Sequence, residues 1–181
     1  MGNRLGITRI FANATHQFAR ACQELKNAPE CQCMKTIITA LDFSDASQAV
    51  LGSAIALAKS QHATLHIVHV LEPEPSYTAY GMTPEEFPAI QIFQQESQKR
   101  AEAKLNHAVA VAKEQVSDVR AELMIGSPLY TIIEYVKKTS ADLVVIGTHG
   151  HGAVAALLIG SVAEGLVRKA VCPTLVIPCK S

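Results

Sequence analysis

The chain of 181 residues contains no tryptophan, and its five phenylalanines and four tyrosines make up only 5% of it. Hydrophobic residues nevertheless account for 49% of the sequence. The core must therefore be built from aliphatic side chains, which is typical of a sheet with helices on both faces. A chain of this length is expected to fold as one domain around one sizeable core.

An excess of charge of either sign is also missing. Sixteen basic and sixteen acidic residues cancel, and no long basic stretch occurs. This balance argues against nucleic acid or an anionic membrane as a partner. No uncharged apolar run approaches the length that crosses a bilayer, so we expect a soluble protein. Small ligands and other proteins remain as partners.

Cysteine spacing typical of zinc sites or of disulfide frameworks is absent as well. The five cysteines are Cys22, Cys31, Cys33, Cys172 and Cys179. Their scatter favours reduced thiols in a cytoplasmic protein. A metal site or a disulfide at Cys31 and Cys33 is the alternative, and two free thiols are the better interpretation there.

Residues 1–33 are interpreted separately from the rest. The stretch from Met1 to Cys22 holds Arg4, Arg9 and Arg20 and no acidic residue, which faintly resembles an organelle-targeting leader. Because Met34 directly precedes the first predicted strand, an upstream start codon or an added tail explains the segment equally well. We predict a poorly ordered extension over 1–33 and one folded domain over 34–181.

From Met34 onward, apolar runs alternate with helical patterns, which indicates βαβ units and a parallel sheet. The predicted strands are Lys35–Leu41, Ala63–Leu71, Val119–Ile125, Leu143–Ile146 and Pro173–Ile177. The predicted helices run from a cap at Ser44 or Asp45 to about Ser60, from about Pro88 to about Gln115, from Pro128 to about Thr139, and from Ser161 to about Ala170. Residues 72–88 hold four prolines, which predicts an irregular loop and allows a lid.

The most informative pattern is a glycine loop after the predicted strand Leu143–Ile146. It reads Gly147-Thr148-His149-Gly150, nine further residues, then Gly160-Ser161. Glycines let the main chain approach an anion closely, and a helix starting near Ser161 would point N–H groups and its positive dipole end at the same place. A glycine-punctuated turn between a strand and a helix is the other interpretation, because short glycine patterns are common.

A second polar feature, Asp42, ends the first predicted strand. Ligands of open parallel sheets bind beyond the carboxyl ends of the strands, where the winding direction reverses. If the first and fourth strands are neighbours, Asp42 and Gly147 flank one crevice. A carboxylate there suits a ribose hydroxyl or a phosphate-bound metal. A favourable charge at the start of the next helix is the alternative role.

Several motifs together resemble the universal stress protein family from Met34 to the end. They are Lys35-Thr36-Ile37-Ile38-Thr39-Ala40-Leu41-Asp42-Phe43-Ser44, His69-Val70, Gly126-Ser127-Pro128, and the glycine loop, which reproduces G-x2-G-x9-G-(S/T) of the ATP-binding branch. The resemblance implies an α/β, Rossmann-like fold, an open five-stranded parallel sheet in the order 3-2-1-4-5 with helices on both faces. It also implies a bound adenine nucleotide.

The resemblance further implies a role for each matching residue. Ala40, Leu41 and Val70 would line the adenine pocket, Ile146 would close it, and Asp42 would face the ribose. Apart from the resemblance, the carboxylate of Asp42 could hold Mg²⁺ bound to ATP. Phosphates would be bound by Gly147, Gly150, Gly160, Ser161 and Val162. The family commonly forms homodimers along the last strand, and the apolar edge Leu175, Val176 and Ile177 fits this role physically. An edge protected by Pro173 and Pro178 is the alternative.

One departure from the family pattern concerns charge. Family loops often place Arg or Lys after the second glycine, whereas this chain has His151 and no Lys or Arg between Gly147 and Ser161. Helix dipole, a divalent cation or a protonated histidine must then meet the phosphate charge. His149 and His151 lack a neighbouring carboxylate or cysteine, so solvated histidines are favoured over a metal site. His66 and His69 have opposite parity on one strand and should face opposite sides.

Three functions follow from this pattern. The leading hypothesis is an ATP-binding, nucleotide-responsive regulatory dimer of the stress response. A slow Mg²⁺-dependent ATPase is the second, although the chain has no Walker lysine, arginine finger or obvious base. A nucleotide-free interaction scaffold is the third, and the intact glycine series disfavours it.

Overall fold

The computed structural model describes residues 34–73, 88–148 and 159–178. Five strands form one parallel sheet in the order β3-β2-β1-β4-β5, which confirms the predicted fold class. The strands are β1 (Thr36–Ala40), β2 (Thr64–Leu71), β3 (Val119–Ile125), β4 (Leu143–Gly147) and β5 (Thr174–Ile177). Each strand begins and ends within about a residue of its predicted bounds.

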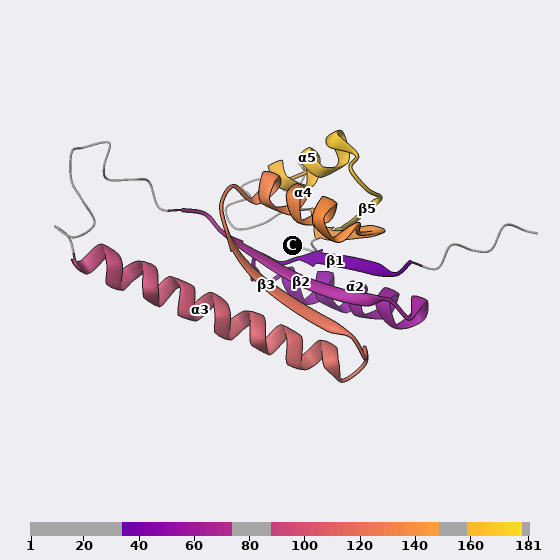
Figure 1. The fold of residues 1–181 in the computed structure, drawn as a ribbon, viewed down its shortest axis with the longest axis horizontal. Helices are drawn as coiled ribbons and strands as arrows, with labels where there is room; N and C mark the ends of the chain where they lie inside the picture. The colour runs from indigo at the N-terminus through magenta and orange to yellow at the C-terminus, as the bar shows by residue number, and fades with distance from the viewer. Residues whose placement is uncertain (1–33, 74–87, 149–158, 179–181) are drawn as a thin grey trace, which may run out of the picture. The chain divides into compact units, whose positions relative to one another are not determined.

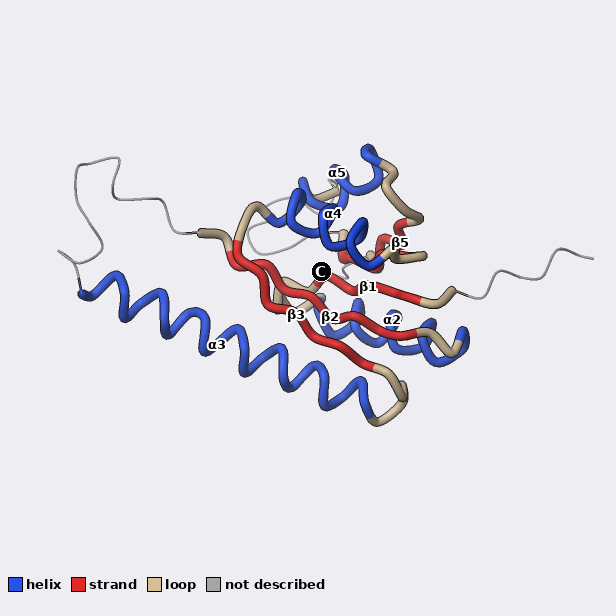
Figure 2. The backbone as a smooth tube through the Cα atoms, viewed as in Figure 1, coloured by secondary structure: helices blue, strands red, loops and turns tan. Residues whose placement is uncertain are grey.

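The helices cover the two faces of the sheet in pairs (Figure 1, Figure 2). Helices α2 (Ser47–Gln61) and α3 (Pro88–Lys113) pack on one face, and α4 (Pro128–Thr139) and α5 (Ser161–Lys169) pack on the other. The core beneath each pair is aliphatic, as expected from the composition. Ile37, Ile67 and Val145 face α2 and α3, whereas Ile38, Val68 and Val144 face α4 and α5.

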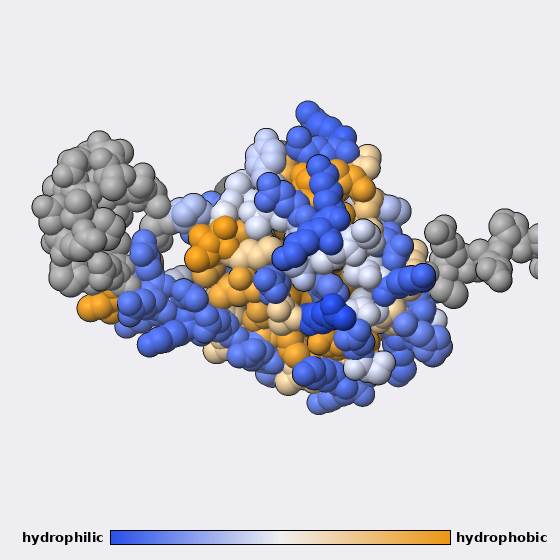
Figure 3. Space-filling view, in the orientation of Figure 1, coloured by the Kyte–Doolittle hydropathy of each residue, from blue (hydrophilic) through white to orange (hydrophobic). Residues whose placement is uncertain are grey.

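Side-chain alternation along the strands sets this division. Among the described side chains of α3, Ala101, Leu105, Ala108 and Ala112 are buried, at helical spacing. On the face shown in Figure 3, hydrophilic residues follow α3, and hydrophobic ones show between this helix and α4. No helix among the described residues is long and apolar enough to span a membrane.

The start of α2 corrects the sequence interpretation. The helix begins at Ser47 with Ala46 as N-cap, and no side chain caps it from that position, so neither Ser44 nor Asp45 is the cap. The buried residues of α2 are Val50, Ala54, Ile55 and Ala58, whereas Ala49 is exposed. This alanine-rich segment places apolar residues on several faces, so its periodicity alone does not define one buried stripe.

Candidate functional site

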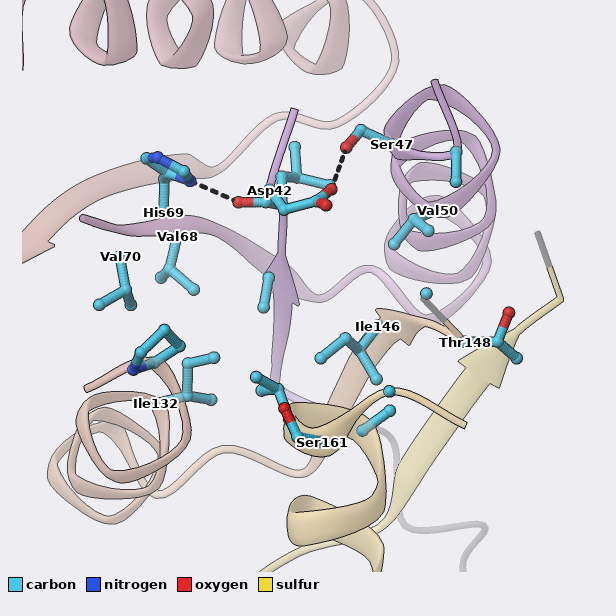
Figure 4. A pocket seen from close by; sticks show the side chains of 18 of the residues that line it. Asp42, Ser47, Val50, Val68, His69, Val70, Ile132, Ile146, Thr148 and Ser161 are labelled. Carbon is cyan, nitrogen blue, oxygen red and sulfur yellow. Dashed lines mark hydrogen bonds between the residues drawn. The ribbon is translucent and has the colours of Figure 1, made fainter. Parts of the chain in front are cut away.

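A pocket of about 480 Å³ lies beyond the carboxyl ends of the central strands. β1 pairs with β2 on one side and with β4 on the other, so the winding direction of the chain reverses between β1 and β4. This is the switch point at which open α/β sheets bind ligands, and the volume lies within the range of small-molecule sites. Figure 4 shows side chains from both sheet faces converging on the pocket.

The predicted site residues that the structure describes all line this one pocket. They are Ala40, Leu41, Asp42, Val70, Ile146, Gly147, Gly160, Ser161 and Val162. Gly150, the remaining member, lies outside the described residues, as do His149 and His151. The two sequence features, the acid after the first strand and the glycines after the fourth, thus flank one crevice.

The β1 side of the pocket is a tight polar corner built around Asp42. Its Oδ1 accepts hydrogen bonds from the Ser44 backbone N–H at 3.1 Å, the Ser44 hydroxyl at 2.8 Å and the Ser47 hydroxyl at 2.9 Å. The carboxylate therefore organises the turn into α2 from outside the helix. This explains why α2 begins later than predicted, with Ala46 as its N-cap. Asp42 serves a local structural role and also lines the pocket.

His69 of β2 links this corner, which follows β1, to the neighbouring strand β2 through a hydrogen bond. Its Nδ1 lies 2.6 Å from the Leu41 carbonyl oxygen, and because a carbonyl only accepts, Nδ1 carries the proton (Figure 4). Leu41 N–H in turn donates to the Val68 carbonyl at 3.0 Å. The His69 ring also contacts the Phe43 ring at a tilt of 44°, with centroids 4.5 Å apart. The ends of β1 and β2 are thus held together at the rim of the pocket.

The floor and walls of the pocket are apolar. Val68 and Val70 project from β2, Ile146 from β4, Val50 from α2 and Ile132 from α4 (Figure 4). Val68 and Val70 share one face of β2 because side chains alternate along a strand. Such a lining suits a flat apolar or aromatic group, since the hydrophobic effect favours its transfer from water.

The β4 side presents main-chain groups. Thr148 N–H donates to the Ile177 carbonyl at 2.8 Å, and Gly160 N–H donates to the Thr148 carbonyl at 2.7 Å. The two ends of the glycine loop are therefore adjacent. Gly160 is the N-cap of α5 with φ −62° and ψ 153°. Any residue adopts this conformation, so the backbone does not require glycine there, and the N–H groups of the first α5 turn have no acceptor within the helix.

Sequence reasoning missed several lining residues. They are Ala46, Ser47, Val50, Val68, His69, Glu72, Pro128, Ile132, Thr148 and Ala163. A rule was available for Glu72, because it follows the end of β2 and carboxyl ends of parallel strands share one sheet edge. Val68 follows from its parity with Val70. The contributions of α2 and α4 depend on how closely these helices pack, which no local pattern encodes.

Metal-binding groups are sparse around the pocket. Among the described residues, no group of three or more His, Cys, Asp or Glu side chains could hold a metal ion. Asp42 and Glu72 are the acidic residues of the described lining, which contains neither Lys nor Arg. The described side chains therefore do not form a protein-only metal cage, and a cation here would take most of its ligands from a bound phosphate or from water.

The universal stress protein family model matches residues 34–178. A related sequence is universal stress protein A homolog 1 of Coxiella burnetii, 36% identical over 146 residues, with 79% of this chain and 95% of the relative covered. Among solved structures, the universal stress protein UspA from Lactobacillus plantarum superposes with a TM-score of 0.70 at 24% identity, covering 80% of this chain and 97% of that one.

A second solved structure is a universal stress protein in complex with cAMP. It superposes with a TM-score of 0.61 at 22% identity, covering 81% of this chain and 98% of that chain. At this identity the likeness concerns the fold alone. The match to the family model begins at residue 34, which is also the first residue that the structure describes.

Proposed function

The chain belongs to the universal stress protein family, and from this membership and the pocket at its switch point we propose that it binds an adenine nucleotide, with ATP as the expected ligand. One observation carries the proposal. The acid after β1 and the glycines bordering the loop after β4 line a single pocket of suitable size. The cAMP complex of a structural neighbour supports the same ligand class.

Each part of the nucleotide has a matching set of groups in this proposal. The adenine would lie against Ala40, Leu41, Val70 and Ile146, whose side chains supply apolar surface. Asp42 would accept a hydrogen bond from a ribose hydroxyl. The phosphates would be held by main-chain N–H groups of Gly147, Gly150 and Val162 and by the Ser161 hydroxyl, at the positive end of α5. Gly160, whose own N–H donates to the Thr148 carbonyl, would border the phosphates at this helix end.

Magnesium fits this arrangement as a companion of ATP. Mg²⁺ is usually bound through one or two carboxylates together with substrate phosphates and water. Asp42 lines the pocket and supplies a carboxylate at its β1 rim. The ion would neutralise part of the triphosphate charge when bound.

We further propose that nucleotide occupancy regulates a cytoplasmic homodimer formed along Leu175, Val176 and Ile177 of β5. Support comes from the hydrogen bond between Thr148 N–H and the Ile177 carbonyl at 2.8 Å, which joins the glycine loop to the edge strand. A ligand that repositions the loop would therefore act directly on the strand that meets the partner. Cys172, the free cysteine that the structure describes, is compatible with a reducing compartment.

The ligand is tested in two steps. The purified protein is denatured and any released nucleotide is identified by mass spectrometry, and the emptied protein is then titrated with Mg-ATP by calorimetry. We expect released or titratable adenine nucleotide. Finding neither would contradict the proposal and leave the scaffold function, whereas rapid release of phosphate during the titration would favour the ATPase.

Placing a negative charge at the α5 N-cap tests whether the phosphates bind at this end of the helix. Gly160→Asp and Gly160→Asn both add a Cβ and both are favourable N-cap residues, so neither should destabilise the helix. Only the aspartate brings negative charge to the phosphate end. We expect Gly160→Asp to bind Mg-ATP at least tenfold more weakly than Gly160→Asn, with equal melting temperatures; equal affinities would contradict phosphate binding at this helix.

A further inference from the structure

The hydrogen-bond ladder between β1 and β2 stops at the rim of the pocket. Its last residue pair is Ala40 with Val68, and Leu41 N–H then donates to the Val68 carbonyl at 3.0 Å. In a parallel ladder the next hydrogen bond would run from Val70 N–H to the Leu41 carbonyl. That bond is absent between these two described residues, both of which line the pocket.

The side chain of His69 explains why the ladder stops there. Its Nδ1 lies 2.6 Å from the Leu41 carbonyl oxygen, so it donates to the acceptor that Val70 N–H would otherwise use (Figure 4). Phe43, at φ 60°, turns the chain just beyond this point, and its ring contacts the His69 ring. A side-chain donor that takes a strand carbonyl in this way competes with the regular pairing of the backbone.

Val70 consequently directs one main-chain donor and one acceptor toward the place where β1 has ended. Successive residues of a strand point these groups to opposite sides, and the Leu71 carbonyl is used on the β3 side, where Gly126 N–H donates to it at 2.9 Å. The N–H and C=O of Val70 therefore lie on the β1 side. Main-chain groups that a ligand covers are costly to leave unpaired, so a ligand that pairs with both is favoured.

We propose that His69 is a positioning residue for base recognition: by holding the Leu41 carbonyl, it keeps the main chain of Val70 open to the edge of the ligand's base. The two Val70 groups require an acceptor beside a donor, which adenine presents at N1 and at its 6-amino group. Hypoxanthine presents the reverse, with N1–H and a 6-oxo group. The inference rests on the proposed adenine site and names the residue that sets its choice of base.

Base selectivity is measured by calorimetry on the intact protein. ATP and inosine triphosphate, each with Mg²⁺, share ribose and triphosphate, so the ratio of their dissociation constants isolates the base. We expect the wild type to bind ATP about tenfold or more tightly than inosine triphosphate, which mismatches the Val70 groups. His69→Phe keeps a ring beside Phe43 and removes the donor, so the Leu41 carbonyl can take Val70 N–H. It should reduce the selectivity to about threefold or less.

Two further variants show whether the donor itself is responsible. His69→Asn places an amide N–H near the position of Nδ1, so it should retain the selectivity of the wild type. His107→Phe makes the aromatic change at an exposed position of α3 and should also leave the ratio unchanged. A purely structural effect of His69→Phe would weaken both nucleotides equally, and the ratio would then keep its wild-type value.

The Val70 amide gives a second readout, which the wild type alone supplies if His69→Phe does not fold. Hydrogen exchange followed by NMR should find this amide poorly protected in the ligand-free protein and protected once Mg-ATP is bound. In His69→Phe it should be protected without ligand, because Val70 N–H then bonds to the Leu41 carbonyl.

The outcomes separate this inference from the function on which it rests. If ATP binds without selectivity, or if selectivity survives in His69→Phe or is lost equally in His69→Asn, the positioning role is wrong and the adenine site stands. A Val70 amide already protected in the ligand-free wild type also contradicts the role. If neither nucleotide binds, the adenine site and the role of His69 in it are both wrong.

Discussion

His66 is a buried histidine whose pKa is coupled to folding. It lies on the face of β2 that α4 covers, is 5% exposed, and its Nδ1 is 3.0 Å from the Tyr135 hydroxyl. Burial lowers the pKa of His66 from 6.5, and the charge of Arg120 acts in the same direction, whereas Asp118 and Glu122 oppose it. His69 contacts the opposite face, as the parity of the two positions predicts.

The depressed pKa of His66 gives a signed dependence of stability on pH. Below pH 6.5 the unfolded chain takes up a proton that the folded protein resists, so the free energy of unfolding falls as pH drops from 6.5 toward the folded pKa. Denaturant unfolding at stepped pH should show this fall in the wild type and a shallower one in His66→Gln. The exposed control His107→Gln should keep the wild-type slope, and an unchanged slope in His66→Gln would contradict the assignment.

Phe43 shows how a single residue shapes the site. Its φ of 60° lies in the left-handed region, which costs a non-glycine residue roughly 1–2 kcal/mol. The contact of the Phe43 ring with His69 and the approach of Lys104 to the ring offset part of this cost. This left-handed conformation turns the chain sharply after Asp42, so that the Asp42 carboxylate reaches Ser44 and Ser47 at the start of α2. No sequence pattern signals this conformation, because phenylalanine is a poor residue for it.

At the scale of the element, two glycines within helices differ in the space that surrounds them. An alanine Cβ at Gly52 in α2 would meet nothing within 4 Å, whereas one at Gly165 in α5 would lie 2.5 Å from Cδ2 of Leu129 in α4. Gly165 thus permits the close packing of α4 and α5 that carries Ile132 and Ser161 to the pocket.

Alanine substitution should separate the two positions. Gly52→Ala should raise the free energy of unfolding by about 1 kcal/mol, because alanine has the higher helix propensity. Gly165→Ala should gain less or lose stability, since Leu129 must move away. Chemical denaturation of both variants measures the difference, and an equal gain at both positions would show that α4 and α5 do not pack this closely.

Elements of this fold were predictable where local chemistry specifies them. The strands are short β-branched runs, and Ser127-Pro128 placed the start of α4 correctly. The ends of α2, α4 and α5 carry left-handed residues that are not glycine, namely His62, Ser140 and Ala170, so the usual C-terminal cap signal is absent there. The three predicted ends are nevertheless within about a residue of the observed ones. The predicted start of α2 was wrong because the carboxylate of Asp42, which follows β1, organises this start in place of a cap residue.

The candidate site divides in the same way. Asp42, Gly147 and Ser161 were found because chain chemistry marks them and sheet topology brings strand ends together. Val50 and Ile132 were not, since their place in the pocket depends on the packing of whole helices against the sheet. The resemblance to a family supplied Ala40 and Val70, which composition and spacing alone would not single out.

At the scale of the whole molecule, the two edges of the sheet differ in character. β3 carries Arg120 and Glu122, and charged side chains on an edge strand discourage pairing with another chain. β5 reads Thr-Leu-Val-Ile, with no charge, and Leu175 is 37% exposed. A second copy is therefore better accommodated at β5 than at β3.

A lysine at each edge tests which one joins two copies. Leu175→Lys should convert a dimer to a folded monomer, because a charge buried at an interface without a partner costs several kcal/mol. Ile125→Lys, at the 65% exposed end of β3, is the matched control and should leave the dimer intact. Sedimentation velocity gives the mass of each variant and circular dichroism confirms folding.

The same variants test the coupling between the dimer and the pocket. Since the Ile177 carbonyl accepts a hydrogen bond from Thr148 N–H beside the pocket, the monomer should also bind Mg-ATP with altered affinity. A dimer that survives Leu175→Lys but dissociates in Ile125→Lys would place the interface at β3 and remove the link between nucleotide and partner.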